Sequence, residues 1–550
     1  MVKSVQFLCL IVLLGLGCNA PETPKSNNRY SDPKLQRIYE LQDQQATRKL
    51  IPLLKSKKTI HREAAVLAFA SIQDSFAVQF LRESLLTDSK INVRQAAAFS
   101  IGQMRDSTNV PTLFMALANE ISSPSRKYIL DALGKSANQK VVDYFNTFHT
   151  TVTQLREGHA RGMYRAIYQR QVGDSFAKQC IRYFDIASSD ETKFYAACVL
   201  ARLPKALTTP YLNEIKGLAG KNPDGEVGRL LKTIIEPQPQ ASNRLDWRVI
   251  MDNLERYKTK PYDLVNDLRH TDLSSREAIL ALKDWSFNHR YQVVRTTAAE
   301  LYLKTVEHNP DTNLNADRIN YLERCIKTRD MALQSLACYE IVKHPDQKWM
   351  TLLRQYQDSL AMPRQIETYL DIEKAFAKIK DRRFVQLPVT YNHSIDWSHV
   401  SQIPDNQRVQ INTTKGLIVV QLNVNEAPGS VSNFLKQVDS DFYTDKYFHR
   451  VVPNFVIQVG CVRGDGWGSP DWTQRSELSN YLTYDTGAVG LASGGKDTEG
   501  VQFFITHNPT PFLDGRYTIF GHVISGMDVV HAMTVGDKIE NIIKVVPSEL

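Results

Sequence analysis

The sequence predicts a multidomain protein in which an array of short helices precedes a mainly-β domain. Up to about residue 381, apolar residues recur at the three- and four-residue steps of amphipathic helices, and one segment pattern returns every 32 residues. From about residue 404 the pattern changes to alternating strands separated by turns. With 550 residues, 42% of them hydrophobic and 23% charged, the chain has the length and composition of several folded units.

The only long apolar run lies at the N-terminus and is typical of a signal peptide. Phe7–Leu16 is nearly all apolar but too short to span a bilayer. Small residues then precede Cys18, which resembles a bacterial lipoprotein signal, although Gly15 stands where such signals usually place Leu. A plain secretory signal cleaved elsewhere is the alternative. We expect a lipoprotein signal over residues 1–17, lipidation of Cys18, and a polar tether over residues 18–45.

Three helical segments of one pattern follow at a fixed spacing. They are Arg62–Ala70, Arg94–Gly102 and Arg126–Gly134. Between them lie second helices such as Ala77–Leu86 and Val110–Leu117, and small residues on the first helices allow neighbouring pairs to approach closely. The pattern resembles HEAT-type repeats, which implies an α-solenoid.

The array is expected to continue over residues 46–381, with a break near Pro237–Pro239. Three later segments repeat the pattern loosely: Tyr195–Leu203, Val294–Leu301 and Leu333–Ile341. Such arrays offer long surfaces to other macromolecules, so we expect this one to bind clients or a protein partner. A spacer that holds the C-terminal domain away from a membrane is the alternative.

The net charge of +8 is unevenly distributed. Before residue 401 there are 56 Lys and Arg against 43 Asp and Glu, and after it there are 11 against 16. A basic array can meet anionic lipid, polysaccharide or acidic proteins, but Lys and Arg on helix faces are more often simply solvated. Nothing in the sequence indicates nucleic acid as a partner.

The cysteines predict neither a disulfide framework nor a metal site. Without the signal and with Cys18 lipidated, five remain: Cys180, Cys198, Cys325, Cys338 and Cys461. An odd number without CxxC spacing argues against paired disulfides. Cys198 and Cys338 lie in apolar helical runs and are expected to be buried small hydrophobes. No cluster of His, Cys and Asp has the spacing of metal ligands.

We expect a linker at residues 382–403 and a second domain over residues 404–550. This domain begins with a predicted β-hairpin of Arg408–Thr413 and Leu417–Leu422. A short helix is predicted next, at Ala427–Gln437. Four motifs and a final helix then follow in order: Phe448–Gly460, Gly490–Ser493, Gly500–Ile505, Phe512–Gly521 and Met527–Met533. Together they resemble the cyclophilin-type peptidyl-prolyl cis/trans isomerases. The resemblance implies a closed barrel with flanking helices and an enzyme that acts on X-Pro bonds of proline-containing clients without a cofactor.

The chemistry of this reaction explains the residue types. An X-Pro amide rotates through a barrier of about 18–20 kcal/mol, and a permanently protonated arginine can donate to the nitrogen of the twisted state. The resemblance assigns this role to Arg450, with Gln458 to orient it and Phe455 in the catalytic group. It also implies eight substrate-binding residues: Val456, Ala492, Ser493, Gln502, Phe504, Phe512, Leu513 and Tyr517.

The domain departs from the family pattern at a few positions. Ser493 stands where Asn is common, while Phe512 and Tyr517 replace the Trp and His of many eukaryotic members, as in bacterial cyclophilins. The insert at residues 462–480 is less standard and is expected to shape substrate entry. We therefore expect a lipid-anchored isomerase of the bacterial envelope, in the periplasm or at the outer membrane. A non-catalytic adaptor that binds proline-containing peptides is the alternative, and retention of Arg450 argues against it.

Overall fold

The structure is a computed structural model of the chain. It describes residues 28–545 except 186, 237–243, 308–311, 387–388 and 390–392. The expected signal, Cys18 and the break at Pro237–Pro239 lie outside the described residues. Within the described part, no helix combines the length and the apolar character that crossing a bilayer requires.

The first half of the described chain is helical. Its α-helices are α1 (Pro33–Asp43), α2 (Thr47–Leu50), α3 (Thr59–Ile72), α4 (Val78–Thr87), α5 (Ile91–Gln103), α6 (Val110–Asn119), α7 (Ser123–Lys135), α8 (Gln139–Thr147), α9 (Thr153–Tyr168), α10 (Phe176–Asp185), α11 (Asp190–Leu200), α12 (Lys205–Thr208), α13 (Leu212–Lys221) and α14 (Gly225–Ile235). The three predicted segments of one pattern lie in α3, α5 and α7. The helical character predicted for this region is confirmed.

Equivalent contacts recur along these helices. Arg62 Nε donates to the Asp88 carboxylate at 2.7 Å, and 32 residues later Arg94 Nε donates to Glu120 at the same distance. The helices α3, α5, α7, α9 and α11 pack on one another in succession. A Cβ on Gly134 would lie 2.1 Å from the carbonyl oxygen of Gly162, so this glycine allows α7 and α9 to touch. A solenoid of the HEAT type remains a prediction.

A second group of helices has its own apolar core. Its members are α15 (Trp247–Asp252), α16 (Leu254–Tyr257), α17 (Pro261–Arg269), α18 (Arg276–Asn288), α19 (Gln292–Glu307), α20 (Thr312–Lys327), α21 (Met331–Lys343), α22 (Trp349–Gln357) and α23 (Ile366–Ile379). Buried side chains from Trp247 to Ile379 form one cluster, and those from Ile38 to Leu231 form another. The apolar core of the helical region is therefore divided between α14 and α15.

Part of the segment predicted as a tether packs against the C-terminal domain. Asn28 Nδ2 donates to the carbonyl oxygens of Val400 and Ile403 at 2.6 and 3.0 Å. Tyr30 and Leu35 are 0% and 1% exposed and join the core of the sheet. Because these apolar side chains are buried, residues 28–43 are a docked segment with helix α1, and a tether over all of residues 18–45 is a wrong prediction.

The C-terminal domain is built on one antiparallel sheet. Its strands are β1 (Arg408–Thr413), β2 (Gly416–Leu422), β3 (Arg450–Val452), β4 (Val456–Val459), β5 (Ala488–Leu491), β6 (Phe503–Thr506), β7 (Ile519–Ser525) and β8 (Ile539–Val545), and its helices are α24 (Trp397–Val400), α25 (Pro428–Asp439) and α26 (Met527–Ala532). The predicted hairpin and both predicted helices are confirmed. Helix α24 lies within the predicted linker.

The strands follow the order β3-β4-β6-β5-β7-β2-β1-β8. The sheet curls, because the segments that precede its two end strands meet at a bridge between Tyr447 and Lys538. Phe448 N donates to the carbonyl oxygen of Asp537 at 2.8 Å beside this bridge. The described strands thus form a curled antiparallel sheet, and the complete closed barrel remains a prediction.

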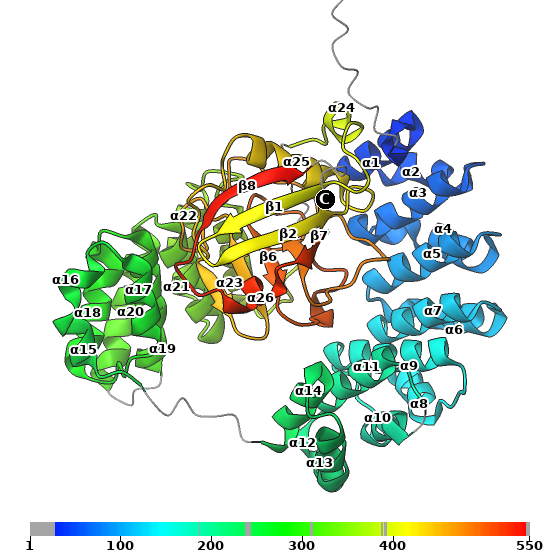
Figure 1. Ribbon diagram of the computed structural model, residues 1–550, viewed down its shortest axis with the longest axis horizontal. Helices are drawn as coiled ribbons and strands as arrows, with labels where there is room; N and C mark the ends of the chain where they lie inside the picture. The colour runs from blue at the N-terminus through cyan, green and yellow to red at the C-terminus, as the bar shows by residue number, and fades with distance from the viewer. Residues whose placement is uncertain are drawn as a thin grey trace, which may run out of the picture.

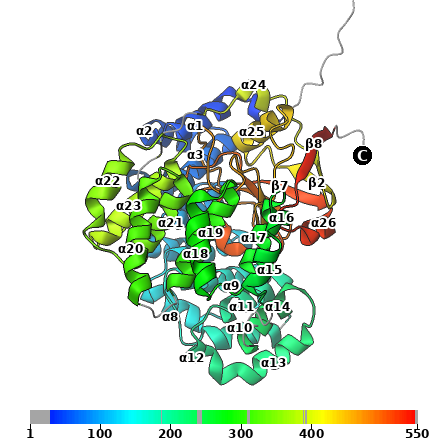
Figure 2. The same cartoon turned by 90° about the vertical axis from the view of Figure 1, so that its left-hand side faces the viewer.

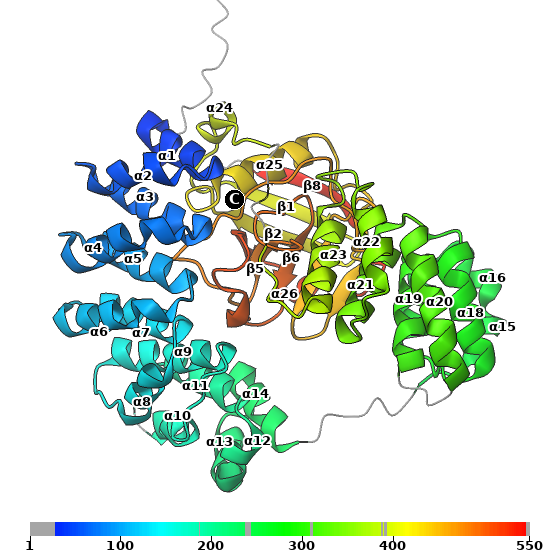
Figure 3. The same cartoon turned by 180° about the vertical axis from the view of Figure 1, so that it is seen from behind.

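The helices flank the sheet domain on two sides. In Figures 1 and 3 the helices α1–α14 form an arc along one side of the domain and α15–α23 lie on the other. Figure 2, in which the side of the second group faces the viewer, shows α18 and α19 in front of the molecule. The sheet domain therefore lies between two helical groups.

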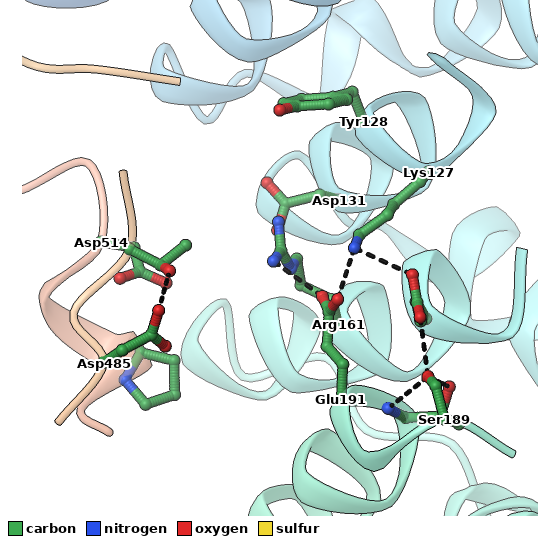
Figure 4. Close-up of polar contacts among 12 residues, drawn as sticks. Lys127, Tyr128, Asp131, Arg161, Ser189, Glu191, Asp485 and Asp514 are labelled. Carbon is green, nitrogen blue, oxygen red and sulfur yellow. Dashed lines mark hydrogen bonds and ion pairs between the residues drawn. The ribbon is translucent and has the colours of Figure 1, made fainter. Parts of the chain in front are cut away.

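Buried polar contacts join the first helical group to the sheet domain. Arg165 of α9 donates to Asp131 of α7 at 3.0 Å and to Asp514 of the sheet domain at 2.9 Å. Figure 4 shows Lys127, Arg161 and other members of the same helical network, with Asp514 on the facing loop. The helices and the sheet domain are packed together by charged groups that are themselves buried.

Candidate active site

Strand register brings the first site residues together. Arg450 on β3 lies opposite Gln458 on β4, Gln458 lies opposite Phe504 on β6, and Phe504 lies opposite Gly490 on β5. Side chains at paired positions of an antiparallel sheet point to the same face. Residues separated by more than 50 positions in the sequence therefore form one row across four strands.

A tight turn positions Phe455 beside this row. The turn joins β3 to β4, with Pro453 at its second position and Asn454 at its third, where φ is +62°. Proline favours the second position of such a turn, and asparagine tolerates a positive φ better than most residues. Phe455 N donates to the carbonyl oxygen of Val452 at 3.0 Å, and His507 N donates to that of Phe455 at 2.8 Å. The turn and His507, the residue that follows β6, thus hold Phe455 at the edge of the site.

A chain of hydrogen bonds orients the arginine. Arg450 Nη1 donates to Gln458 Oε1 at 3.3 Å, and Gln458 Nε2 donates to Gln502 Oε1 at 3.0 Å. Gln502 Nε2 in turn lies 3.2 Å from the carbonyl oxygens of Gly466 and Gly468 in the insert. Each amide has one donor and one acceptor engaged, so the direction of the chain presents the Gln458 oxygen to the guanidinium.

Aromatic and aliphatic side chains form an apolar wall next to the arginine. The Arg450 guanidinium carbon lies 5.6 Å from the centre of the Phe455 ring, and the ring centres of Phe455 and Phe512 lie 5.4 Å apart. Phe504 and Leu513 are each 6% exposed and belong to the same apolar cluster. A proline ring would find apolar contacts here within reach of a permanently charged donor.

One cavity collects every residue that the sequence assigned to the site. Its volume is about 330 Å³, at the lower end of the range of about 300–1,000 Å³ that ligand pockets occupy. The predicted residues that line it are Arg450, Phe455, Val456, Gln458, Ala492, Ser493, Gln502, Phe504, Phe512, Leu513 and Tyr517. Their individual roles remain predictions, but they are neighbours in space.

Six further residues line this cavity and were not assigned to it from the sequence. They are Tyr339, Glu367, Asp371, Gly466, Trp467 and Gly494. Trp467 belongs to the insert at residues 462–480, and Gly494 adjoins a predicted motif. The first three come from α21 and α23 of the helical region. No local signal distinguishes them from other residues of amphipathic helices.

The two sides of the cavity differ in charge. Although the Arg450 residue is exposed overall, the protein atoms around its guanidinium lower its pKa by desolvation, and Arg269 adds to this effect; an arginine nevertheless stays protonated at any working pH. Burial raises the pKa of Glu367 to about 7, and the neighbouring Asp371 raises it further, while Lys374 opposes the rise. Burial also raises the pKa of Asp371, against the effect of Lys374. The cavity therefore has a fixed cation and a pair of acids.

The five predicted free cysteines are buried and unpaired by disulfides. Burial raises the pKa of Cys198 to about 12 and that of Cys461 to about 11, so neither is a thiolate at neutral pH. In the part of the chain that the structure describes, no three His, Cys, Asp or Glu side chains are grouped to hold a metal ion.

Comparisons with known proteins concern the sheet domain. Residues 408–547 match the family described as cyclophilin type peptidyl-prolyl cis-trans isomerase/CLD. Peptidyl-prolyl cis-trans isomerase B of Bacillus subtilis is 44% identical over 126 residues, which are 23% of this chain and 88% of that protein. Peptidyl-prolyl cis-trans isomerase 9 of Schizosaccharomyces pombe is 41% identical over 131 residues, which are 23% of this chain and 22% of that protein.

A crystal structure of a cyclophilin type peptidyl-prolyl cis-trans isomerase of Cryptosporidium parvum, obtained in the presence of the dipeptide Ala-Pro, shares 29% identity with this chain. The match covers 26% of this chain and 99% of that one, with a TM-score of 0.25. The family assignment rests on the bacterial relative, because the chain covers most of that protein at high identity. Through residues 408–547, the chain belongs to the cyclophilin-type peptidyl-prolyl cis-trans isomerase family.

Proposed function

We propose that the protein catalyses cis/trans isomerisation of X-Pro bonds in protein clients and that Arg450 is its main catalytic group. The observation that carries the proposal is the hydrogen-bond chain from Gln502 through Gln458 to Arg450, beside an apolar pocket in the same cavity. It combines an oriented cationic donor with a surface that accepts a proline ring. The relatives in the comparisons carry the name of the same activity.

The reaction requires no bond to be broken. Rotation destroys the partial double bond of the amide, and the nitrogen regains a lone pair that can accept a hydrogen bond. Arg450 donates to that nitrogen, while the apolar wall holds the ring and the preceding carbonyl swings. An acceleration of about 10⁵ requires about 7 kcal/mol of selective stabilisation, which a charge-assisted hydrogen bond and orientation within a pocket supply together.

The helical region and the cellular location are part of the same proposal. The helices form a HEAT-like solenoid that binds clients or a partner, and lipidated Cys18 anchors the chain in the bacterial envelope. The repeated Arg62–Asp88 and Arg94–Glu120 contacts support the solenoid. The apolar run before Cys18 supports the anchor. Metabolic labelling with a radioactive fatty acid, lost in Cys18→Ala, tests the anchor directly.

A binding adaptor without turnover is the second candidate. It is favoured by the exposure of Arg450, because a solvated guanidinium stabilises a transition state less than a desolvated one. The engaged amides of Gln458 and Gln502 favour the enzyme, because a binding groove alone does not need an oriented arginine.

Exchange NMR on an Ala-Pro peptide separates the two candidates without a coupled protease. The full chain is expected to accelerate the cis/trans exchange, and Arg450→Ala is expected to remove most of the acceleration. Arg408→Ala is the matched control, since Arg408 lies on β1 of the same sheet and outside the cavity. A folded wild type that binds the peptide without accelerating exchange supports the adaptor.

A further inference from the structure

The second helical group supplies one wall of the groove. Tyr339 of α21, with Glu367 and Asp371 of α23, lines the cavity that also contains Arg450 and the apolar pocket. Glu367 and Asp371 are four residues apart and therefore lie on the same face of α23. The substrate site is thus built from two parts of the chain, although the family motifs occupy only the sheet domain.

The insert of the sheet domain is held by the same helices. Arg463 Nη2 donates to the Asp330 carboxylate at 3.0 Å, and Asp330 also caps the N-terminus of α21 by accepting from Ala332 N. Thr296 Oγ1 of α19 donates to Asp465 at 2.8 Å. Trp467 follows Asp465 by two residues and lines the cavity, and its ring centre lies 6.0 Å from that of Tyr339. The second helical group therefore fixes the part of the insert that contains Trp467 and lines the groove.

Glu367 lies directly against the strand end that lines the groove. A Cβ on Gly494 would lie 2.6 Å from Glu367 Cγ, so the absence of a side chain at residue 494 leaves the room that Glu367 occupies. Gly494 follows Ser493, one of the predicted substrate-binding residues. The Glu367 carboxyl group is thus next to the path of a peptide bound along Ala492 and Ser493.

The two acids differ in how their charge is compensated. Lys374 Nζ donates to Asp371 Oδ1 at 2.8 Å. No hydrogen bond or ion pair to Glu367 is found among the described residues. The Arg450 guanidinium donates to Gln458, and no ion pair between Arg450 and Glu367 is found in the part of the chain that the structure describes. One negative charge therefore remains available on this wall of the groove when Glu367 is ionised.

We propose that the helical wall makes the groove selective, so that Glu367, which lines the cavity together with Asp371, Tyr339 and Trp467, favours X-Pro segments with a lysine or arginine close to the proline. The proposal rests on the isomerase function proposed above and adds the class of substrate. A partly buried carboxylate without a partner attracts a cationic side chain, while an acidic side chain at the same place meets repulsion in a medium of reduced polarity. The rings of Tyr339 and Trp467, which line the same cavity, can pack against the aliphatic part of lysine or arginine.

The test compares peptides that differ in one charge. Ala-Pro peptides of equal length carry Lys, Gln or Glu two residues before the proline, and a second set carries the same residues two positions after it. Exchange NMR with the full chain gives the rate of isomerisation for each. For at least one of the two sets, we expect the Lys peptide to be isomerised about 3- to 10-fold more efficiently than the Gln peptide at pH 8, and the Glu peptide less efficiently than both.

Substitutions identify the origin of the preference. In Glu367→Gln the ratio of Lys to Gln peptide is expected to fall to about 1, and in Glu367→Lys the Glu peptide is expected to become the best of the series. Glu373→Gln is the matched control: Glu373 is on the same helix, accepts from Gln357 Nε2 at 2.7 Å and does not line the cavity. This control should keep the ratio of the wild type.

The outcomes separate this inference from the proposed function. Equal acceleration of Lys, Gln and Glu peptides by the wild type, in both sets, overturns the charge preference and leaves the isomerase intact. Failure to accelerate any peptide overturns the isomerase. In that case, the binding constants of the same peptides, measured by chemical-shift titration, decide whether the groove prefers a cation.

Discussion

Arg165 of α9 donates a hydrogen bond to the Asp514 carboxylate at 2.9 Å, and the two residues are only 7% and 8% exposed. The same guanidinium donates to the carbonyl oxygen of Pro511. Pro511 and Asp514 enclose Phe512 and Leu513, which line the groove. Arg165 therefore holds the loop that carries Phe512 and Leu513, two residues of the groove.

Arg165→Met is expected to lower stability strongly. The substitution leaves Asp514 and Asp131 without their shared partner, and breaking a buried ion pair from one side costs about 3–5 kcal/mol. Burial already raises the pKa of Asp514, and without Arg165 the ionised form of this carboxyl group is disfavoured further. Urea unfolding measures the loss.

The double variant Arg165→Met/Asp514→Asn serves as the control for this prediction. Its destabilisation should be smaller than the sum of the single effects, because the buried charge is removed together with its partner. Additive single effects would show that the two residues are not coupled. Raised KM values for Ala-Pro peptides in Arg165→Met would indicate that the Phe512 loop has also moved.

Gln458→Leu is expected to reduce kcat/KM by about 10- to 100-fold. Hydrogen bonds to charged groups contribute about 1.5–3 kcal/mol, and Gln458 supplies the acceptor that orients the Arg450 guanidinium. The rate of isomerisation of an Ala-Pro peptide provides the measurement. Gln421→Leu on β2, a half-buried glutamine outside the cavity, should retain the activity of the wild type. Equal rates for all three proteins would contradict the orienting role.

Gly490→Ala is expected to destabilise the sheet domain by about 1–3 kcal/mol, the usual cost of overpacking. A Cβ at this position would lie 2.3 Å from Tyr484 Oη and 2.7 Å from Phe504 Cζ. Tyr484 Oη donates to the Thr518 carbonyl oxygen, so the ring cannot retreat without losing that bond. Thermal unfolding measures the effect.

The matched glycine is Gly217 in α13, where an added Cβ meets nothing within 4 Å. Because alanine is favoured over glycine inside a helix, Gly217→Ala should stabilise the protein by about 0.5–1 kcal/mol. A thermal unfolding midpoint for Gly490→Ala as high as that for Gly217→Ala would refute the close packing around Phe504.

The preference for cationic peptides is expected to grow with pH. Glu367 has a pKa of about 7, so it is mostly neutral at pH 6 and mostly ionised at pH 8. The ratio of kcat/KM for Lys and Gln peptides should therefore rise across this interval, and it should be flat in Glu367→Gln. Asp371 and Lys374 also face the Glu367 carboxyl group. The variants Asp371→Asn and Lys374→Met show whether either residue shifts the pH at which the ratio is halfway through its rise.

Stability should depend on the same ionisation with the opposite sign. The pKa of Glu367 rises from 4.5 in the unfolded chain to about 7 in the folded one, so the folded state binds the proton more tightly. Folding stability is therefore lost as pH rises from about 4.5 through 7. Glu367→Gln should be more stable than the wild type at pH 8 and nearly equal to it at pH 4, as urea unfolding at the two pH values can establish.

Much of the site was predictable because its determinants are local. The Phe448–Gly460 motif contains both strands of one hairpin, and the turn at Pro453 fixes the register that sets Arg450 opposite Gln458. The 32-residue step likewise placed three helices correctly. The docked segment at residues 28–43 was missed although Leu35, Ile38 and Leu41 form an apolar stripe, because eleven residues of helix carry no information about the surface that buries them.

The helices, the hairpin and the set of residues around Arg450 follow from the amino-acid pattern alone, since each depends on periodicity, turn chemistry or a short motif. That α21 and α23 line the groove follows only from the way in which the folded parts of the chain pack together. Glu367 and Gly494 are more than 100 residues apart, and their contact depends on how two folded surfaces fit together. In the sequence, Glu367 and Asp371 are two acids on one helix face, as found on any solvated helix. Their position against the groove gives them raised pKa values, because burial there disfavours the charged form.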